Sequence, residues 1–206
     1  MGAFPRTIKP AQVTYPKVIG SLISVGQSGA LQTRSEASQG RTWQETWSAL
    51  PAGSADVQDL ITTVEDLYNT GATCTLVHYL LPGSGLARNG SGGGTSPLVK
   101  GGSQAGTSLN TDGWTGGSVS GVMKAGDCFT IANIDVLFRV TADADTTSGE
   151  ETLSILPPLI GSAPVDNAAI TIVDATLTAV VLDYSDATAG PDEYIGGFTV
   201  TFLEAP

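Results

Sequence analysis

The chain has 206 residues and a formal net charge of −11, from nine basic and 20 acidic side chains. Nucleic-acid binding needs clustered Lys and Arg to neutralise phosphate, so this balance disfavours it. Glycine and proline number 26 and 11, below the share that marks a disordered chain, and only 14% of residues are charged. Frequent Ser, Thr and Gly with few charges predict a mainly β fold of short strands and tight turns.

The N-terminal segment predicts a hairpin followed by a tryptophan-bearing strand. Residues 18–25 and 30–34 flank Gly26 and Gly29, which supply the backbone freedom of a hairpin turn. In residues 40–50, Trp43 and Trp47 have an even spacing that places both rings on one face of a strand. Packing in a core or interface is the favoured interpretation of these candidate aromatics. A stacking platform for bases or sugars is the alternative.

A single helix is predicted over residues 55–69. Apolar side chains recur there at three- and four-residue spacing, from Val57 to Tyr68. Ser54 is the expected N-cap, Asp56 and Asp59 lie where the helix dipole favours anions, and Gly71 is placed to end the helix. Residues 73–81 return as a strand. Cys74 and Cys128, far apart in sequence, are expected to be buried free thiols.

Composition divides the remainder of the chain. Residues 82–96 are Gly- and Ser-rich and predict a linker. Beyond it, short strands are expected at residues 98–100, 117–123, 128–131, 136–141, 152–156 and 168–173, as in a small closed barrel. Two further strands, at 177–184 and 195–203, are expected to complete the first domain. The predicted domains are therefore 1–92 with 174–206, discontinuous, and an inserted β domain at 97–173.

No catalytic or metal site is expected. His78 is the only histidine and lies in a predicted strand without a partner motif. The segment with Asp143, Asp145 and Gly149 has alternating carboxylates, but its spacing does not fit a calcium loop, so an acidic hairpin turn is predicted. Asp112 and Asp127 are expected to be turn aspartates. The sequence thus predicts a non-enzymatic protein without cofactor.

The chain resembles the distal tail proteins of long-tailed, siphovirus-like bacteriophages. Four N-terminal motifs carry this resemblance: Ser28-Gly-Ala-Leu-Gln-Thr-Arg34, Gly40-Arg-Thr-Trp43, Leu50-Pro51 and Leu80-Leu-Pro82. The closing segment Gly197-Phe-Thr-Val-Thr-Phe-Leu-Glu204 looks like the last strand of the same domain. The segments Leu98-Val-Lys-Gly-Gly-Ser103, Met123-Lys-Ala-Gly-Asp127, Phe138-Arg-Val-Thr-Ala-Asp143 and Pro164-Val-Asp-Asn-Ala-Ala-Ile170 look like a module common in phage structural proteins.

The resemblance implies a split β-sandwich or barrel "belt" domain with one helix and an inserted OB-like barrel. It further implies a hexameric ring in the virion tail tip that joins the tail tube protein to the tail hub protein of the baseplate. The phage DNA would pass through the lumen without specific binding, no membrane partner is expected, and synthesis would occur in the host cytoplasm.

Charge suggests where a lumen would be lined. Residues 173–206 carry six acidic groups and no basic one. Asp183, Asp186, Asp192 and Glu193 are therefore the candidate lumen-facing acidic residues, with a merely solubilising turn as the equal alternative. Two other functions stay open: a tail tube or tail-completion subunit, and a carbohydrate-binding module that uses Trp43, Trp47 or Trp114.

Overall fold

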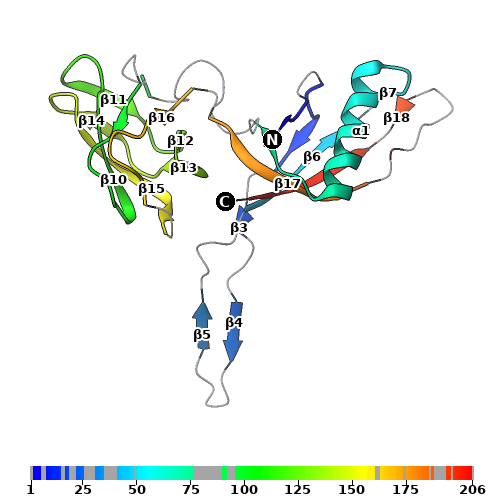
Figure 1. The fold of residues 1–206 in the computed structure, drawn as a ribbon, viewed down its shortest axis with the longest axis horizontal. Helices are drawn as coiled ribbons and strands as arrows, with labels where there is room; N and C mark the ends of the chain where they lie inside the picture. The colour runs from blue at the N-terminus through cyan, green and yellow to red at the C-terminus, as the bar shows by residue number, and fades with distance from the viewer. Residues whose placement is uncertain are drawn as a thin grey trace.

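The computed structural model describes residues 2–5, 8–14, 17–18, 22–25, 31–34, 41–48, 50–76, 90–91, 96–160, 163–173, 175–185, 187, 194–195 and 197–205. The fold is mainly β with one helix, as predicted from composition. Two sheet bodies lie side by side, one a half-barrel with the helix and the other a nearly closed barrel (Figure 1).

The first body is a sheet built from segments far apart in the chain. Its strands are β1 (Gly2–Ala3), β2 (Gln12–Val13), β3 (Lys17–Val18), β6 (Arg41–Trp47), β8 (Cys74–Leu76), β17 (Leu177–Tyr184) and β19 (Phe198–Glu204). The order is β1-β8-β17-β19-β6-β2, with β3 also on β6. The strands from residues 177–204 therefore lie in the middle of the sheet, between β8 and β6. They connect β8 to β6, two strands that do not pair with each other.

Helix α1 (Ala55–Thr70) packs against β17 and covers one end of this sheet (Figure 1). It begins one residue after Ser54, as predicted, but the Ser54 side chain makes no capping hydrogen bond. The C-terminal prediction is confirmed: Gly71 has φ 64° and ψ 20°, a left-handed conformation that glycine adopts without steric cost. Most of the predicted apolar stripe is buried, whereas Tyr68 is 45% exposed and packs its ring against Tyr184.

The second body contains β9 (Leu98–Val99), β10 (Gly106–Asp112), β12 (Cys128–Ile131), β13 (Ile134–Val140), β15 (Glu151–Leu159) and β16 (Ile170–Thr171). Their order is β16-β12-β13-β15-β10-β9. The two ends of this sheet meet, because the amide of Val99 donates to Ala168 and the amide of Ile170 donates to Pro97. A two-stranded sheet of β11 (Val119–Met123) and β14 (Ala144–Thr146), which are separated in the chain by β12 and β13, packs beside the barrel.

The sequence prediction lacks two strands of the second body, and one predicted turn is shorter than the segment assigned to it. β10 was left without secondary structure because its sequence, Gly-Thr-Ser-Leu-Asn-Thr-Asp, is rich in turn residues; only Leu109 and Thr111 are buried there. The hairpin turn predicted in residues 143–151 is present between Thr147 and Glu150, but Asp145 lies before it, within strand β14. The turn is at Ser148 and Gly149, which have φ of 56° and 78°.

The hairpin predicted near the N-terminus is present as β4 (Leu22–Val25) and β5 (Leu31–Arg34), paired from Leu22↔Arg34 to Val25↔Leu31. Within the described part of the chain these two strands form a sheet of their own. They project away from both bodies (Figure 1). A further short pair, β7 (Leu50–Pro51) with β18 (Tyr194–Ile195), lies at the helix end of the first body.

Each body has its own apolar core, and the two cores touch. The first core gathers side chains from the first sheet and α1, and the second gathers side chains between residues 99 and 172. Leu137 and Cys128 of the second body belong to the first core. The second body therefore covers the end of the first sheet that α1 leaves uncovered. Both cysteines are buried and form no disulfide, as expected.

Candidate functional site

The two candidate aromatics, Trp43 and Trp47, are buried on one face of β6, at 2% and 1% exposure. The Trp43 ring stacks on Phe202 with centroids 5.2 Å apart, and Trp47 lies 5.9 Å from Phe198. Their even spacing correctly indicated a shared face, and the face is a core. Trp114 is also buried, with its indole N–H donating to Thr111 Oγ1 at 2.8 Å. All three indoles are therefore unavailable as a stacking platform in this conformation.

A buried carboxylate between the two tryptophans was not anticipated. Glu45 is fully buried, and Trp43 Nε1 donates to its Oε1 at 3.3 Å. Buried charge needs hydrogen-bond partners to offset lost solvation. The sequence did indicate this position of Glu45. Alternate residues of a strand face the same side, so Glu45 must face the same side of the sheet as Trp43 and Trp47.

The acidic lumen candidates are only partly within the described residues. Asp183 lies near the end of β17, opposite Thr201 of β19, and its side chain is exposed. Asp186, Asp192 and Glu193 lie outside the described residues, as does His78. Asp183 therefore places the start of the acidic segment at one end of the first sheet.

The carboxylates of Asp143 and Asp145 bind neighbouring chain segments. Asp143 accepts from the Ala125 amide at 3.0 Å and from Lys124 Nζ at 2.9 Å. Asp145 accepts from the Gly121 amide at 2.6 Å and from Ser120 Oγ at 2.9 Å. The backbone hydrogen bonds are the main reason why the pKa of each carboxyl lies below its usual value. In the described part of the chain, no group of three or more His, Cys, Asp or Glu is arranged to hold a metal ion.

These pKa shifts predict a pH-dependent stability. A carboxylate with a depressed folded-state pKa stabilises the fold above its unfolded value, near 3.8, and this contribution is lost as pH falls through the folded-state pKa. We expect Asp143→Asn to reduce stability near neutral pH and to have little effect well below pH 3.8. Urea unfolding of both proteins over a pH series measures this. A stability difference that does not change with pH would contradict the expectation.

Asp127 joins the segment predicted as a linker to the second body. Its carboxylate is fully buried, and Oδ2 accepts from the amides of Lys124 at 2.7 Å and Gly90 at 3.0 Å. The Ser91 amide donates to Gly121. Residues 90 and 91 therefore belong to the packed second body, which begins before the predicted boundary at 97. The prediction of a turn aspartate at 127 did not include this buried anchoring role.

The close approach at Gly90 allows a test of this anchor. A Cβ on Gly90 would lie 2.5 Å from the Val122 carbonyl oxygen and 2.6 Å from the Met123 Cα, both backbone atoms. Gly90→Ala must therefore shift the segment away from Asp127. We expect a loss of about 1–3 kcal/mol in unfolding free energy, the range for removing one hydrogen bond to a buried carboxylate. Gly53→Ala, where a Cβ would meet nothing within 4 Å, is the control. Equal effects of the two substitutions would contradict the anchor.

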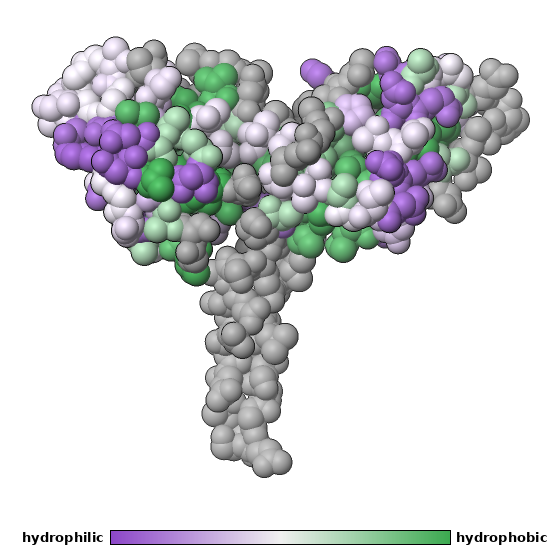
Figure 2. Space-filling view, viewed as in Figure 1, coloured by the Kyte–Doolittle hydropathy of each residue, from purple (hydrophilic) through white to green (hydrophobic). Residues whose placement is uncertain are grey.

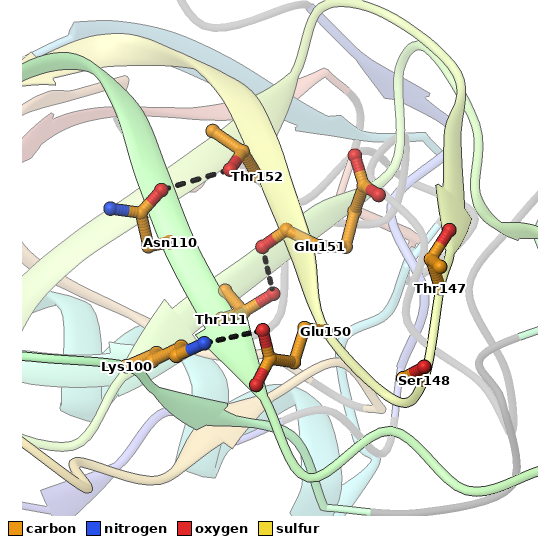
Figure 3. A pocket seen from close by; sticks show the side chains of 8 residues that line it. All are labelled: Lys100, Asn110, Thr111, Thr147, Ser148, Glu150, Glu151 and Thr152. Carbon is orange, nitrogen blue, oxygen red and sulfur yellow. Dashed lines mark hydrogen bonds and ion pairs between the residues drawn. The ribbon is translucent and has the colours of Figure 1, made fainter. Parts of the chain in front are cut away.

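A shallow pocket of about 600 Å³ opens on the second body (Figure 3). It is lined by Lys100, Asn110, Thr111, Thr147, Ser148, Glu150, Glu151 and Thr152. Much of its polar lining is already paired: Lys100 with Glu150, the Thr152 hydroxyl with Asn110, and the Thr111 hydroxyl with the Glu151 carbonyl. The last two contacts join β10 to β15, and the three contacts do not converge on a common point in the pocket (Figure 3).

No protein family matches the sequence, and a search of curated proteins found no significant relative. Within the described residues, no helix is both long and apolar enough to cross a membrane. The proposals below therefore rest on this chain's own structure and on the resemblance of its motifs.

Proposed function

We propose that this chain is a structural subunit of a tailed-phage tail, a distal tail protein that assembles into a hexameric ring between the tail tube and the tail hub. The observation that carries the proposal is the β4–β5 hairpin, which projects away from both bodies and pairs with no other described strand (Figure 1). A two-stranded hairpin alone is only marginally stable in water. A neighbouring subunit would supply the surface that it lacks.

The exposed apolar side chains are consistent with assembly. Large apolar residues that are more than one-third exposed occur on both bodies: Tyr68, Leu156, Ile160, Val165, Val173, Leu182 and Tyr194. Apolar surface is visible on the lower side of both bodies in the view of Figure 2. Apolar surface of this kind marks interaction sites when it is contiguous. The split belt domain and the OB-like identity of the second body form part of the same proposal.

The oligomeric state tests the proposal directly. We expect mass photometry of the full chain to show a species of six times the 21.0 kDa chain mass, and negative-stain images to show rings. Replacing residues 22–34 with a Gly-Ser linker should give monomers whose melting temperature is unchanged, because among the described strands β4 and β5 pair only with each other. A full chain that stays monomeric at every concentration would overturn the proposal.

Within such a ring, we propose that the segment from Asp183 to Glu193 faces the lumen. Six copies of its carboxylates would then repel passing DNA over about one Debye length, roughly 8–10 Å at physiological salt. Changing Asp186, Asp192 and Glu193 to lysine is expected to leave rings intact and to slow DNA ejection from virions, most strongly at low salt. Ejection kinetics that match the wild type at low salt would leave solubility as the role of this segment.

A further inference from the structure

An ion pair lies where the first sheet meets the second body. Arg41 begins β6 and Glu204 ends β19, and the β6–β19 register, with Thr42 opposite Leu203, makes them cross-strand neighbours. Arg41 Nε donates to Glu204 Oε2 and Arg41 Nη2 to Glu204 Oε1, each at 2.6 Å. The two side chains are 15% and 5% exposed. This is a bidentate, largely desolvated pair, the strongest geometry for Arg and a carboxylate.

The pair also binds the backbone of the other body. Arg41 Nη2 donates to the Leu137 carbonyl at 2.5 Å, and the Leu137 amide donates to Glu204 Oε1 at 3.2 Å. One residue of β13 thus has both its donor and its acceptor satisfied by side chains of the first sheet. In a sheet, an adjacent strand would supply the same donor and acceptor.

The sequence explains why no described strand of the second body lies next to Leu137 on that side. β15 pairs with β13 at Arg139↔Leu156 and Val140↔Ile155, and continuing this register would place Pro158 opposite Leu137. Pro157 and Pro158 have no amide hydrogen, so they cannot donate to the β13 edge. β15 continues along β10 instead, to the pair Gly106↔Leu159. The edge of β13 at Leu137 is therefore left open within its own barrel.

We propose that the Arg41–Glu204 pair is a latch that substitutes for a β-strand at Leu137 and thereby fixes the orientation of the second body on the first sheet. The apolar contacts of Leu137 and Cys128 with the first core provide attraction, but such contacts have little directionality. The two hydrogen bonds to the Leu137 backbone fix both the position and the orientation of the second body relative to the first sheet. The latch does not depend on the proposed tail function.

The test compares inter-body distances with and without the latch. Spin labels on Thr62→Cys in α1 and Ser108→Cys in β10, both exposed positions, report the distance between the bodies, while the buried Cys74 and Cys128 stay unlabelled. Arg41→Met with Glu204→Leu removes both partners of Leu137 without leaving an unpaired buried charge, a replacement that folded proteins often tolerate. We expect one narrow distance distribution in the unaltered background and a broad one in the double variant.

Amide hydrogen exchange at Leu137 provides the second readout. Its amide should lose protection in the double variant, whereas the amide of Phe138, opposite Phe129 of β12, should keep it. Glu204→Leu alone removes the acceptor of the Leu137 amide and leaves Arg41, which is 15% exposed, within reach of solvent, so it should give the same selective loss if the double variant does not fold. The control is Lys124→Met with Asp143→Leu, an exposed ion pair inside the second body, which should leave the distances unchanged.

A narrow distance distribution together with full Leu137 protection in the folded double variant would overturn the latch. If the double variant does not fold, full Leu137 protection in Glu204→Leu would overturn it. The apolar contacts alone would then orient the bodies. Broadening in the Lys124 and Asp143 control would equally overturn it, because the motion would not depend on this pair.

Discussion

Replacing Trp43 with alanine is expected to lower the unfolding free energy by about 3–5 kcal/mol, the range for removing a large aromatic side chain from a core. The indole is 2% exposed and belongs to β6, which lies between β19 and the short strands β2 and β3. It stacks on Phe202, whose ring also meets Phe4 edge-on at 5.3 Å. The substitution also removes the indole donor to buried Glu45, so the loss should lie at the upper end of this range.

Urea unfolding followed by circular dichroism measures the effect of Trp43→Ala. The matched control is Gln44→Ala, the next residue on the same strand, whose side chain is exposed. It should change stability by less than about 0.5 kcal/mol. A Trp43 variant that unfolds at the same urea concentration as the control would show that the indole is not part of the core.

Deleting residues 97–173 is the second large change. From sequence alone, a short Gly-Ser bridge in their place should leave a folded belt that still forms rings, because loop closure depends weakly on length. The structure changes the expected stability. The deletion removes Leu137 and Cys128 from the first core and both backbone partners of the Arg41–Glu204 pair. We expect a folded belt that is less stable by roughly 2–5 kcal/mol, comparable to the loss of one large buried apolar side chain.

Thermal unfolding of the deletion variant and of the full chain carrying Leu137→Ala separates the contributions. The point substitution keeps the hydrogen bonds to the Leu137 backbone, so it should cost less than the deletion. A deletion variant as stable as the full chain would show that the first sheet does not need the second body. Complete loss of cooperative unfolding would show that residues 97–173 are not an insertion into an otherwise self-sufficient domain.

Sequence patterns were most successful where one local rule determined the structure. The helix was found from its apolar spacing and Gly71, and β12 and β17 were found to the residue because their runs are apolar and β-branched. β10 was missed because its position depends on pairing with β15 and β9, which its polar residues do not reveal. Its strand state is imposed by tertiary contacts.

The candidate site residues show the same limit. The two-residue alternation of a strand correctly placed Trp43 and Trp47 on a common face. The same alternation places Glu45 on that face, but a charged residue was not expected in the core. The Arg41–Glu204 pair was beyond local reasoning, because 163 positions separate its members and its third partner, Leu137, contributes only backbone atoms. Contacts of this kind depend on register between distant strands.

The strand order of the first sheet has a consequence for folding during synthesis. In the described sheet, β6 and β8 are connected through β19 and β17. The pairing of the first sheet therefore cannot be completed until residues 177–204 have left the ribosome. At about 5–20 residues per second, the N-terminal strands would wait roughly 6–26 s after residue 76 is made. All the strands of the second body emerge within this interval and can pair with one another. The nascent chain should therefore acquire its second body first and then fold the surrounding sheet onto it.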